Sequence, residues 1–220
     1  MKASIALSIS VLNADFSRLE ESLKPVDSFA DSFHVDIMDG TLTPIISFGS
    51  WIIPVLRSIV KARLDIHLYI RNPLEVYSEV LEKGASRVIV DFKAAKAILA
   101  RKKAHTRPDL GVYLLPTDEV GSIDLSVLQK VSVVNVITVN SLMGGQEISW
   151  DLVERTRWLD ELKRTHGLSF DISVDGGINE DVLDRILEYP VNQVIVGSAI
   201  LTSADPSACA SRFKEKLTAS

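Results

Sequence analysis

The chain has 220 residues, of which 46% are hydrophobic and 24% charged, and its formal net charge is −5 at pH 7. This length and composition predict one globular domain of ordinary soluble type over residues 1–220. The negative charge argues against a nucleic-acid partner, because a nucleic-acid surface needs clustered Lys and Arg. The single cysteine, Cys209, leaves no pair for a disulfide bond within the chain. That is typical of a reducing compartment, so a cytoplasmic location is expected.

The N-terminal residues predict a first β-strand. Ser8 and Ser10 alternate with the apolar Ile9 and Val11, and a period of two is typical of a strand rather than of a signal peptide. Along the rest of the chain no apolar run approaches the ~20 residues that a membrane-spanning helix needs. No membrane partner is therefore expected.

Short runs rich in β-branched residues then alternate with segments that carry apolar residues at helical spacing. The runs predicted as strands are Ile5–Leu12, Ser32–Ile37, Leu64–Ile70, Arg87–Phe92, Gly111–Leu115, Val131–Val139, Phe170–Val174 and Gln193–Val196. Strands that alternate with helices pair in parallel, and eight such units in ~220–250 residues predict a single (β/α)8 (TIM) barrel. An open doubly wound sheet is the alternative. It is disfavoured because no G-x-G-x-x-G motif follows the first strand.

Polar residues gather at the predicted strand ends, where a barrel of this kind carries its site. His34, Asp36 and Met38 share one face of the second strand, because residues i and i+2 point the same way. His67 lies on the third strand and Asp175 ends the seventh. The two imidazoles and two carboxylates are expected to converge on one divalent metal ion, with Zn²⁺, Fe²⁺, Mn²⁺ or Co²⁺ preferred over Mg²⁺ or Ca²⁺. Separate satisfaction of each group by hydrogen bonds is the alternative.

Small residues follow the last three predicted strands, as Gly144-Gly145-Gln146, Gly176-Gly177 and Gly197-Ser198. Glycine lets backbone N–H groups approach an anion closely, and the loops after strands seven and eight are the recurring phosphate site of the barrel. Tight turns alone explain a single glycine pair, but three on consecutive strands favour a phosphate site. A metal at one side of the mouth and a phosphate at the other predict a sugar phosphate as ligand.

Six motifs resemble the ribulose-phosphate 3-epimerase family, a group of ketose-phosphate 3-epimerases that includes the allulose-6-phosphate 3-epimerases. They occur in the family's order and spacing over nearly the whole chain, and H-V-D-I-M-D-G together with V-D-G-G-I is the specific part. The motifs are Ser10–Phe16, His34–Gly40, Asp65–Leu68, Gly144–Gln146, Val174–Gly177 and Gly197–Ile200. The resemblance implies a barrel of the ribulose-phosphate-binding type.

The resemblance also implies a role for each site residue. His34, Asp36, His67 and Asp175 would hold the metal, and Asp36 and Asp175 would be the catalytic acid and base on opposite faces of the sugar. Ser10 and His67 would contact the substrate, Met38 would cushion a planar intermediate, and the Gly-Gly-Gln, Asp-Gly-Gly and Gly-Ser segments would hold the phosphate. The implied reaction interconverts ribulose 5-phosphate and xylulose 5-phosphate by two-base proton transfer at C3 through a cis-enediolate.

Several positions depart from the family pattern. Ile45 follows Pro44 where the family has P-N, Asn140–Met143 replaces N-P-G-F, and Tyr69 and Ile137 stand where methionine is common. None of these changes removes a metal ligand or an acid/base group, so the reaction type is expected to survive. The substrate stays open, with allulose 6-phosphate as the alternative.

Two other functions compete with the epimerase. A sugar-phosphate decarboxylase is disfavoured, because its D-x-K-x-x-D motif is represented only by Asp91–Lys96, which lacks the second Asp. A non-catalytic paralogue that senses a sugar phosphate is favoured by the altered loop and disfavoured by the paired Asp36 and Asp175. For the oligomeric state, apolar helices and the tryptophans Trp51, Trp150 and Trp158 favour a homo-oligomer.

Overall fold

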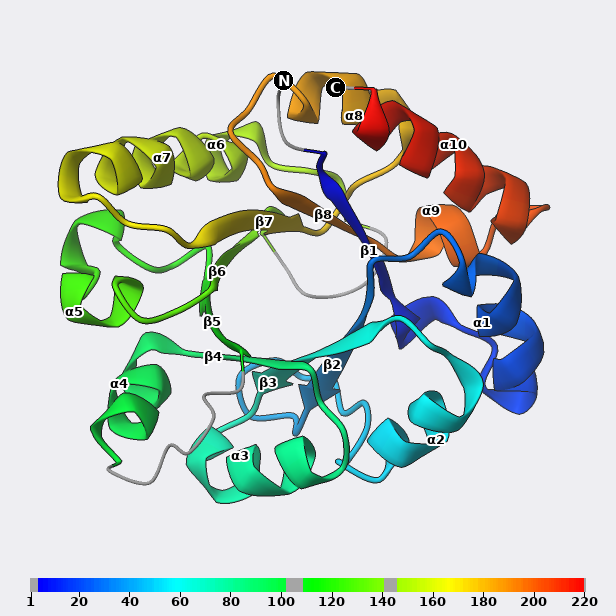
Figure 1. Cartoon of the computed structure of the whole chain (residues 1–220), viewed down its shortest axis with the longest axis horizontal. Coiled ribbons are helices and arrows are strands. Elements are labelled where there is room, and N and C mark those ends of the chain that lie inside the picture. The colour runs from blue at the N-terminus through cyan, green and yellow to red at the C-terminus, as the bar shows by residue number, and fades with distance from the viewer. Residues whose placement is uncertain (1–3, 102–108, 141–145, 220) are drawn as a thin grey trace.

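A computed structural model describes residues 4–101, 109–140 and 146–219 and forms a closed barrel of eight parallel strands in sequence order (Figure 1). The strands are β1 Ala6–Ser10, β2 Ser32–Met38, β3 Arg63–Tyr69, β4 Arg87–Val90, β5 Asp109–Leu114, β6 Val133–Ile137, β7 Asp171–Asp175 and β8 Gln193–Val196. Strand β1 pairs with both β2 and β8, so the sheet has no free edge. The predicted (β/α)8 barrel is confirmed.

The helices form a ring around the barrel (Figure 1). The α-helices are α1 Leu19–Asp27, α2 Ile52–Ile59, α3 Pro73–Glu82, α4 Phe92–Ala100, α5 Leu125–Leu128, α6 Trp150–Val153, α7 Arg155–His166, α8 Glu180–Ile186, α9 Ser198–Leu201 and α10 Pro206–Thr218. Short 3₁₀ turns are η1 Val11–Asn13, η2 Phe16–Arg18 and η3 Val120–Ser122. Among the described residues, no helix combines the length and the apolar character needed to cross a bilayer.

Most of the hydrophobic core lies between the strands and the helices. Residues that alternate along each strand point outward, so that Phe33 and Val35 on β2 and Val194 and Val196 on β8 are fully buried there. Burial of one such side chain contributes roughly 1.5–3 kcal/mol. This outer layer packs the strands against the helices, and the interior of the barrel is left for other side chains.

The interior of the barrel is largely polar. Its lower layer is a buried network in which Arg87 Nη1 donates to Asp65 Oδ2 at 3.5 Å and to Gln193 Oε1 at 3.3 Å. Gln193 Nε2 donates in turn to Ser32 Oγ at 3.0 Å. A buried carboxylate needs such a partner, and the network closes the barrel beneath the candidate site.

Above this floor, part of the interior is apolar. A small cluster joins Met38, Tyr69, Ile89, Tyr113 and Val133 from successive strands β2 to β6. Residue 111, an inward position of β5, is a glycine. A Cβ there would lie only 2.5 Å from Cγ1 of Val133, so no larger residue fits. The cluster therefore fills the β3–β5 side of the barrel and leaves the polar groups of β2, β3 and β7 around an open space.

The three tryptophans differ in exposure. Trp51, just before α2, has 59% of its surface exposed, whereas Trp150 and Trp158 are half-buried and pack against the core. Trp150 also stacks on Tyr189 at 6.3 Å between ring centroids and lies 3.7 Å below the guanidinium carbon of Arg185. Trp150 is thus engaged within the chain, and only Trp51 presents a large free face.

Candidate active site and metal centre

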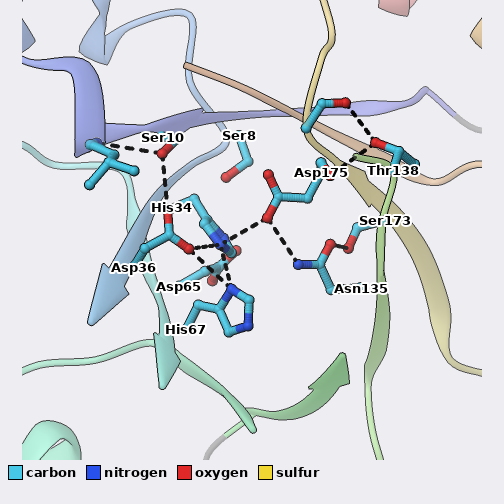
Figure 2. Close-up of polar contacts among 12 residues, drawn as sticks. Ser8, Ser10, His34, Asp36, Asp65, His67, Asn135, Thr138, Ser173 and Asp175 are labelled. Atoms are coloured by element: carbon cyan, nitrogen blue, oxygen red, sulfur yellow. Dashed lines mark hydrogen bonds and ion pairs between the residues drawn. The ribbon is translucent and has the colours of Figure 1, made fainter. Parts of the chain in front are cut away.

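Four side chains from three strands converge at the carboxyl end of the barrel (Figure 2). His34 and Asp36 come from β2, His67 comes from the adjacent position of β3, and Asp175 ends β7. One ligand atom from each lies within 4.8 Å of the others. The structure therefore brings together all four residues that were predicted from the sequence as metal ligands.

The individual contacts centre on two ring nitrogens. His34 Nε2 lies 3.1 Å from Asp36 Oδ1, 3.5 Å from Asp175 Oδ2 and 3.2 Å from His67 Nδ1. His67 Nδ1 is also 3.1 Å from Asp36 Oδ1. Two imidazole nitrogens and two carboxylates facing one point match the ligand types that bind a divalent transition metal.

The electrostatics of this cluster favour a positive charge at its centre. Burial alone would lower the pKa of His34, but the carboxylates of Asp36, Asp175 and Asp65 outweigh it and raise that pKa to about 9. Burial would raise the pKa of Asp36, yet His34 and the hydrogen bonds from both imidazoles hold it well below its usual range. Burial raises the pKa of Asp175, His34 opposes that shift and the charge of Asp36 adds to it.

The ring nitrogens of His34 and His67 that point away from the cluster centre show which tautomers a bound cation would require. Within the described part of the chain, His34 Nδ1 and His67 Nε2 are buried and have no hydrogen-bond partner. A neutral imidazole that ligates through one nitrogen carries its proton on the other, so ligation through His34 Nε2 and His67 Nδ1 assigns both tautomers. The donor set, its burial and its charge therefore fit one divalent metal ion.

Each carboxylate is held by neighbouring side chains. Ser10 Oγ donates to Asp36 Oδ2 at 3.3 Å, which places Ser10 at the site as the sequence motifs implied. On the opposite side, Asn135 Nδ2 donates to Asp175 Oδ2 at 3.3 Å, and Ser173 Oγ donates to Asn135 Oδ1 at 2.8 Å (Figure 2). The two carboxylates thus have separate supports, one from β1 and one from β6 and β7.

Sequence reasoning did not nominate Asn135, Ser173, Ser47 or Thr138. Ser47 donates to the backbone oxygen of Asp36 and accepts from the backbone nitrogen of Met38. Thr138 Oγ1 lies 2.9 Å from the backbone oxygen of Asp175. The sequence does contain one indication that Asn135 faces the barrel interior: it is a polar residue between Val134 and Val136 in a buried strand.

A cavity of about 690 Å³ extends from the cluster to the loops after β6, β7 and β8. Its lining includes every predicted site residue in the described ranges except His34, which is completely buried beneath it. These lining residues are Ser10, Asp36, Met38, His67, Gln146, Asp175, Gly176, Gly177, Gly197 and Ser198. The predicted contacts of Gly144 and Gly145 lie outside the described residues.

The glycines after β7 are required by packing. Gly176 and Gly177 have positive φ angles of +113° and +72°, which L side chains rarely adopt. A Cβ on Gly177 would lie 2.6 Å from the backbone nitrogen of Ile148, and one on Gly176 would lie 2.8 Å from Cγ2 of Val139. These two glycines therefore let the loops after β6 and β7 approach each other at the edge of the cavity.

The cavity wall near those loops carries no Lys or Arg among the described residues, whereas Glu147 and Asp181 are part of it. An anion there would meet backbone N–H groups rather than cationic side chains. Helix α9 begins at Ser198, directly after Gly197, and α8 begins at Glu180. Both helices start at this end of the cavity. Asn179 Oδ1 already accepts from the backbone nitrogens of Asp181 and Val182 in the first turn of α8. Helix α9 has no side-chain cap, so its first N–H groups are the ones open to an anion.

Tyr69 forms the wall on the β3 side, and Tyr113 packs behind it. Tyr69 lines the cavity and contacts His67 edge-on, with 5.5 Å between ring centroids. Tyr113 lies 5.3 Å from Tyr69 and 4.7 Å from His67. Burial raises the pKa of Tyr69 to about 12, and the charge of Asp118 adds to this.

The fold and the cluster define a class: a (β/α)8 barrel with a buried centre of two histidines and two aspartates that is suited to a divalent cation. Within that class the match to a known family is direct. The model of the ribulose-phosphate 3 epimerase family matches residues 6–201, and the chain belongs to this family. Its members are isomerases that act on carbohydrates, and the resemblance stated from the sequence motifs is confirmed.

Relatives at moderate identity support the same assignment. Ribulose-phosphate 3-epimerase from Synechocystis sp. is 32% identical over 92% of this chain and 90% of its own length. The Treponema pallidum ribulose-phosphate 3-epimerase is 30% identical over 92% of this chain and 94% of its own length. Among solved structures, KGPDC from Streptococcus mutans has a TM-score of 0.70 at 17% identity, covering 98% of both chains. That last similarity concerns the fold alone.

Proposed function

We propose that this chain is a metal-dependent ketose-phosphate 3-epimerase that interconverts ribulose 5-phosphate and xylulose 5-phosphate. The observation that carries the proposal is the placement of Asp36 and Asp175. They come from β2 and β7, face one buried pair of imidazoles and both line the cavity. Inversion of a carbon without turning the intermediate over needs two such groups, one for each face.

The metal ligands in this proposal are His34 Nε2, His67 Nδ1 and one oxygen each of Asp36 and Asp175. A bound cation, Zn²⁺, Fe²⁺, Mn²⁺ or Co²⁺, would supply positive charge that stabilises the negative charge developing on the C2 oxygen and C3 of the sugar. A carboxylate with an ordinary pKa near ~4 is a weak base at pH 7. Close placement of the two carboxylates against C3 therefore has to supply much of the remaining rate.

The two carboxylates have different tasks in each direction. One removes the C3 proton on its face, and the other returns a proton to the opposite face of the planar cis-enediolate. Their environments are unequal, since Asp36 is held ionised by both imidazoles while burial makes Asp175 easier to protonate. Met38 also lines the cavity and offers an apolar contact to the planar carbon skeleton.

The phosphate is proposed to bind at the far end of the cavity. Backbone N–H groups of the Gly176-Gly177 and Gly197-Ser198 segments, with the Gln146 segment, would hold it. The absence of Lys and Arg from the described wall supports recognition through backbone N–H groups, including those at the uncapped start of α9. The substrate then extends from this end toward the imidazole and carboxylate cluster.

Proton NMR in D₂O tests the reaction directly. The metal-loaded protein is incubated with ribulose 5-phosphate and, separately, with allulose 6-phosphate, with and without a chelator. Deuterium uptake at C3 with formation of the epimer, abolished by chelator, is expected. No exchange with either sugar by a protein that holds its metal would overturn the proposal and leave the sensor alternative.

A hexulose phosphate is the second candidate, supported by the volume of the cavity. About 690 Å³ falls in the middle of the usual range for small-molecule sites and leaves room for one more carbon between C3 and the phosphate. The faster of the two sugars in the exchange experiment decides between them. The decarboxylase alternative gains no support, because Asp91 caps α4 by accepting from the backbone nitrogen of Ala94 at 2.9 Å.

The proposal includes a homo-oligomer. The large apolar side chains that are exposed in the described ranges belong to η2, the β2–α2 loop and α2, and they are Phe16, Leu42, Ile46, Trp51 and Val55. Phe16 connects these segments through a ring contact with Phe48 at 4.9 Å. Light scattering tests the assembly: Ile46→Asp is expected to shift the protein toward the monomer, and an unchanged mass would remove the support from this surface. A cytoplasmic location stays a prediction.

A further inference from the structure

Tyr69 lines the candidate site but has no role in the proposed metal binding or proton transfer. It lies on β3 two residues after His67, on the same inward face, and its register partner is Met38 on β2. Only 4% of its surface is exposed, and that surface borders the cavity. The residue is therefore part of the wall that a bound sugar meets, although it is neither a metal ligand nor an acid/base group.

The ring of Tyr69 is fixed in place. Its plane is nearly perpendicular to that of His67, at 85°, and Tyr113 packs on another side at 40°. Aromatic contacts of this geometry add to the stability gained from burial. A side chain held in this way presents its hydroxyl in one direction at little further entropic cost on binding.

The hydroxyl of Tyr69 forms no hydrogen bond within the described residues. The nearby carboxylate of Asp118 accepts instead from the backbone nitrogen of Leu115 at 2.7 Å. A tyrosine hydroxyl carries one O–H donor, and Tyr69 lines the cavity, so a bound ligand can accept from it. Buried tyrosine hydroxyls normally have a partner, and a ligand bound in the cavity would supply one.

The topology of the barrel indicates which part of a bound sugar phosphate would face Tyr69. In an eight-stranded barrel β3 lies opposite β7, as Figure 1 shows. The glycines of the proposed phosphate site follow β7 and β8, and Asp36 and Asp175 lie between that end and the β3 wall. A ketose phosphate with its phosphate on the glycine loops and C3 between the carboxylates directs C1 toward Tyr69.

We propose that Tyr69 is a specificity-determining residue whose hydroxyl donates a hydrogen bond to the C1 hydroxyl of the substrate, an inference that rests on the proposed epimerase function. Methionine, which the related family commonly has at this position, offers no donor. This chain would therefore discriminate at C1, selecting ketose phosphates that carry a hydroxyl there over 1-deoxy analogues.

The test compares D-xylulose 5-phosphate with 1-deoxy-D-xylulose 5-phosphate in the C3 exchange assay. The wild-type protein is expected to prefer the hydroxylated sugar about tenfold in kcat/KM, the effect of one well-formed hydrogen bond. Tyr69→Phe keeps the ring and removes the donor, so it should lose this preference by slowing only the hydroxylated sugar. Tyr113→Phe is the matched control, because Tyr113 packs on the same rings but does not line the cavity, and it should keep the preference.

A second measurement separates failure of this inference from failure of the proposed function. Xylitol 5-phosphate carries the C1 hydroxyl but has no carbonyl and cannot epimerise, so calorimetry reports its binding alone. About tenfold weaker binding to Tyr69→Phe than to wild type and Tyr113→Phe supports the C1 contact even if no exchange is seen. Equal binding by all three proteins, or an unchanged sugar preference in Tyr69→Phe, would overturn it.

Discussion

Asn135 donates a hydrogen bond from β6 to the Asp175 carboxylate at the end of β7, with 3.3 Å between Nδ2 and Oδ2. The amide itself is oriented by the hydroxyl of Ser173, which donates to its oxygen. Asp175 is thereby held at the cavity by a group that cannot change its charge. This bond lowers the pKa of Asp175 and opposes the effect of burial.

Removal of that donor gives the first prediction. Asn135→Leu is close in size, so the barrel should fold, but the pKa of Asp175 should rise further because a hydrogen bond to its ionised form is lost. We expect the acid limb of the kcat/KM profile to move to higher pH and metal affinity or activity to fall about 10- to 100-fold. Ser173→Ala, which leaves the Asn135 donor in place, should shift the limb less. Superimposable profiles for Asn135→Leu and wild type would contradict this role.

The acid/base assignment gives the second prediction. Asp36→Asn and Asp175→Asn should each lower C3 exchange by at least about 10³-fold, because each removes the proton-transfer group for one face. The circular dichroism spectrum and cooperative thermal unfolding should be retained, since both side chains border the cavity rather than the hydrophobic core. Near-normal turnover by either variant would rule out the two-base scheme.

The raised pKa of His34 gives a prediction for metal uptake. With a pKa of about 9, His34 is protonated at pH 7 when no cation is bound, and ligation requires the neutral ring. Metal binding must then release a proton, so the apparent affinity should rise about tenfold per pH unit up to pH ~9 and level off above it. Calorimetry in two buffers of different ionisation enthalpy measures the proton count at pH 7. A count near zero would show that His34 is already neutral.

Three glycines give a graded prediction for stability. Gly167→Ala introduces a side chain at φ +61° in open space, so it should cost roughly 1–2 kcal/mol of unfolding free energy for the left-handed backbone alone. Gly177→Ala adds a contact with the backbone of Ile148 and should cost more. Gly121→Ala, with neither a positive φ nor an atom within 4 Å, should be near neutral. Urea denaturation gives the order, and a Gly177→Ala midpoint equal to that of Gly121→Ala would contradict the packing argument.

The sequence predicted the strands well because β-branched runs between helical segments have few alternative structures. The sixth strand was predicted as Val131–Val139 but pairs only over Val133–Ile137. Val131 and Val139 are both buried, so the apolar run exceeds the ladder. Hydrophobicity marks burial, and only the hydrogen bonds to neighbouring strands decide where a strand ends.

The convergence of the four candidate metal ligands was predictable for a related reason. His34 and Asp36 share a face by spacing alone, His67 lies in the carboxyl half of β3, and Asp175 ends β7. The place of Asn135 between two buried valines marks it as an inward-facing polar residue. Its contact with Asp175 was not predictable, because that contact depends on the register that sets Asn135 beside Ser173 on β7. The packing role of Gly177 was also invisible, since the residue it meets, Ile148, belongs to another loop.

The proposed proton-transfer and metal-binding groups all reside on strands, whereas the proposed phosphate contacts reside in the loops that follow β6, β7 and β8. Strand positions are fixed by two neighbours each, while loops at the mouth tolerate replacement. This separation makes the barrel a modular starting point for protein engineering. Grafting loops from other sugar-phosphate barrels would change which sugar is held, and the reactive centre beneath would keep its geometry.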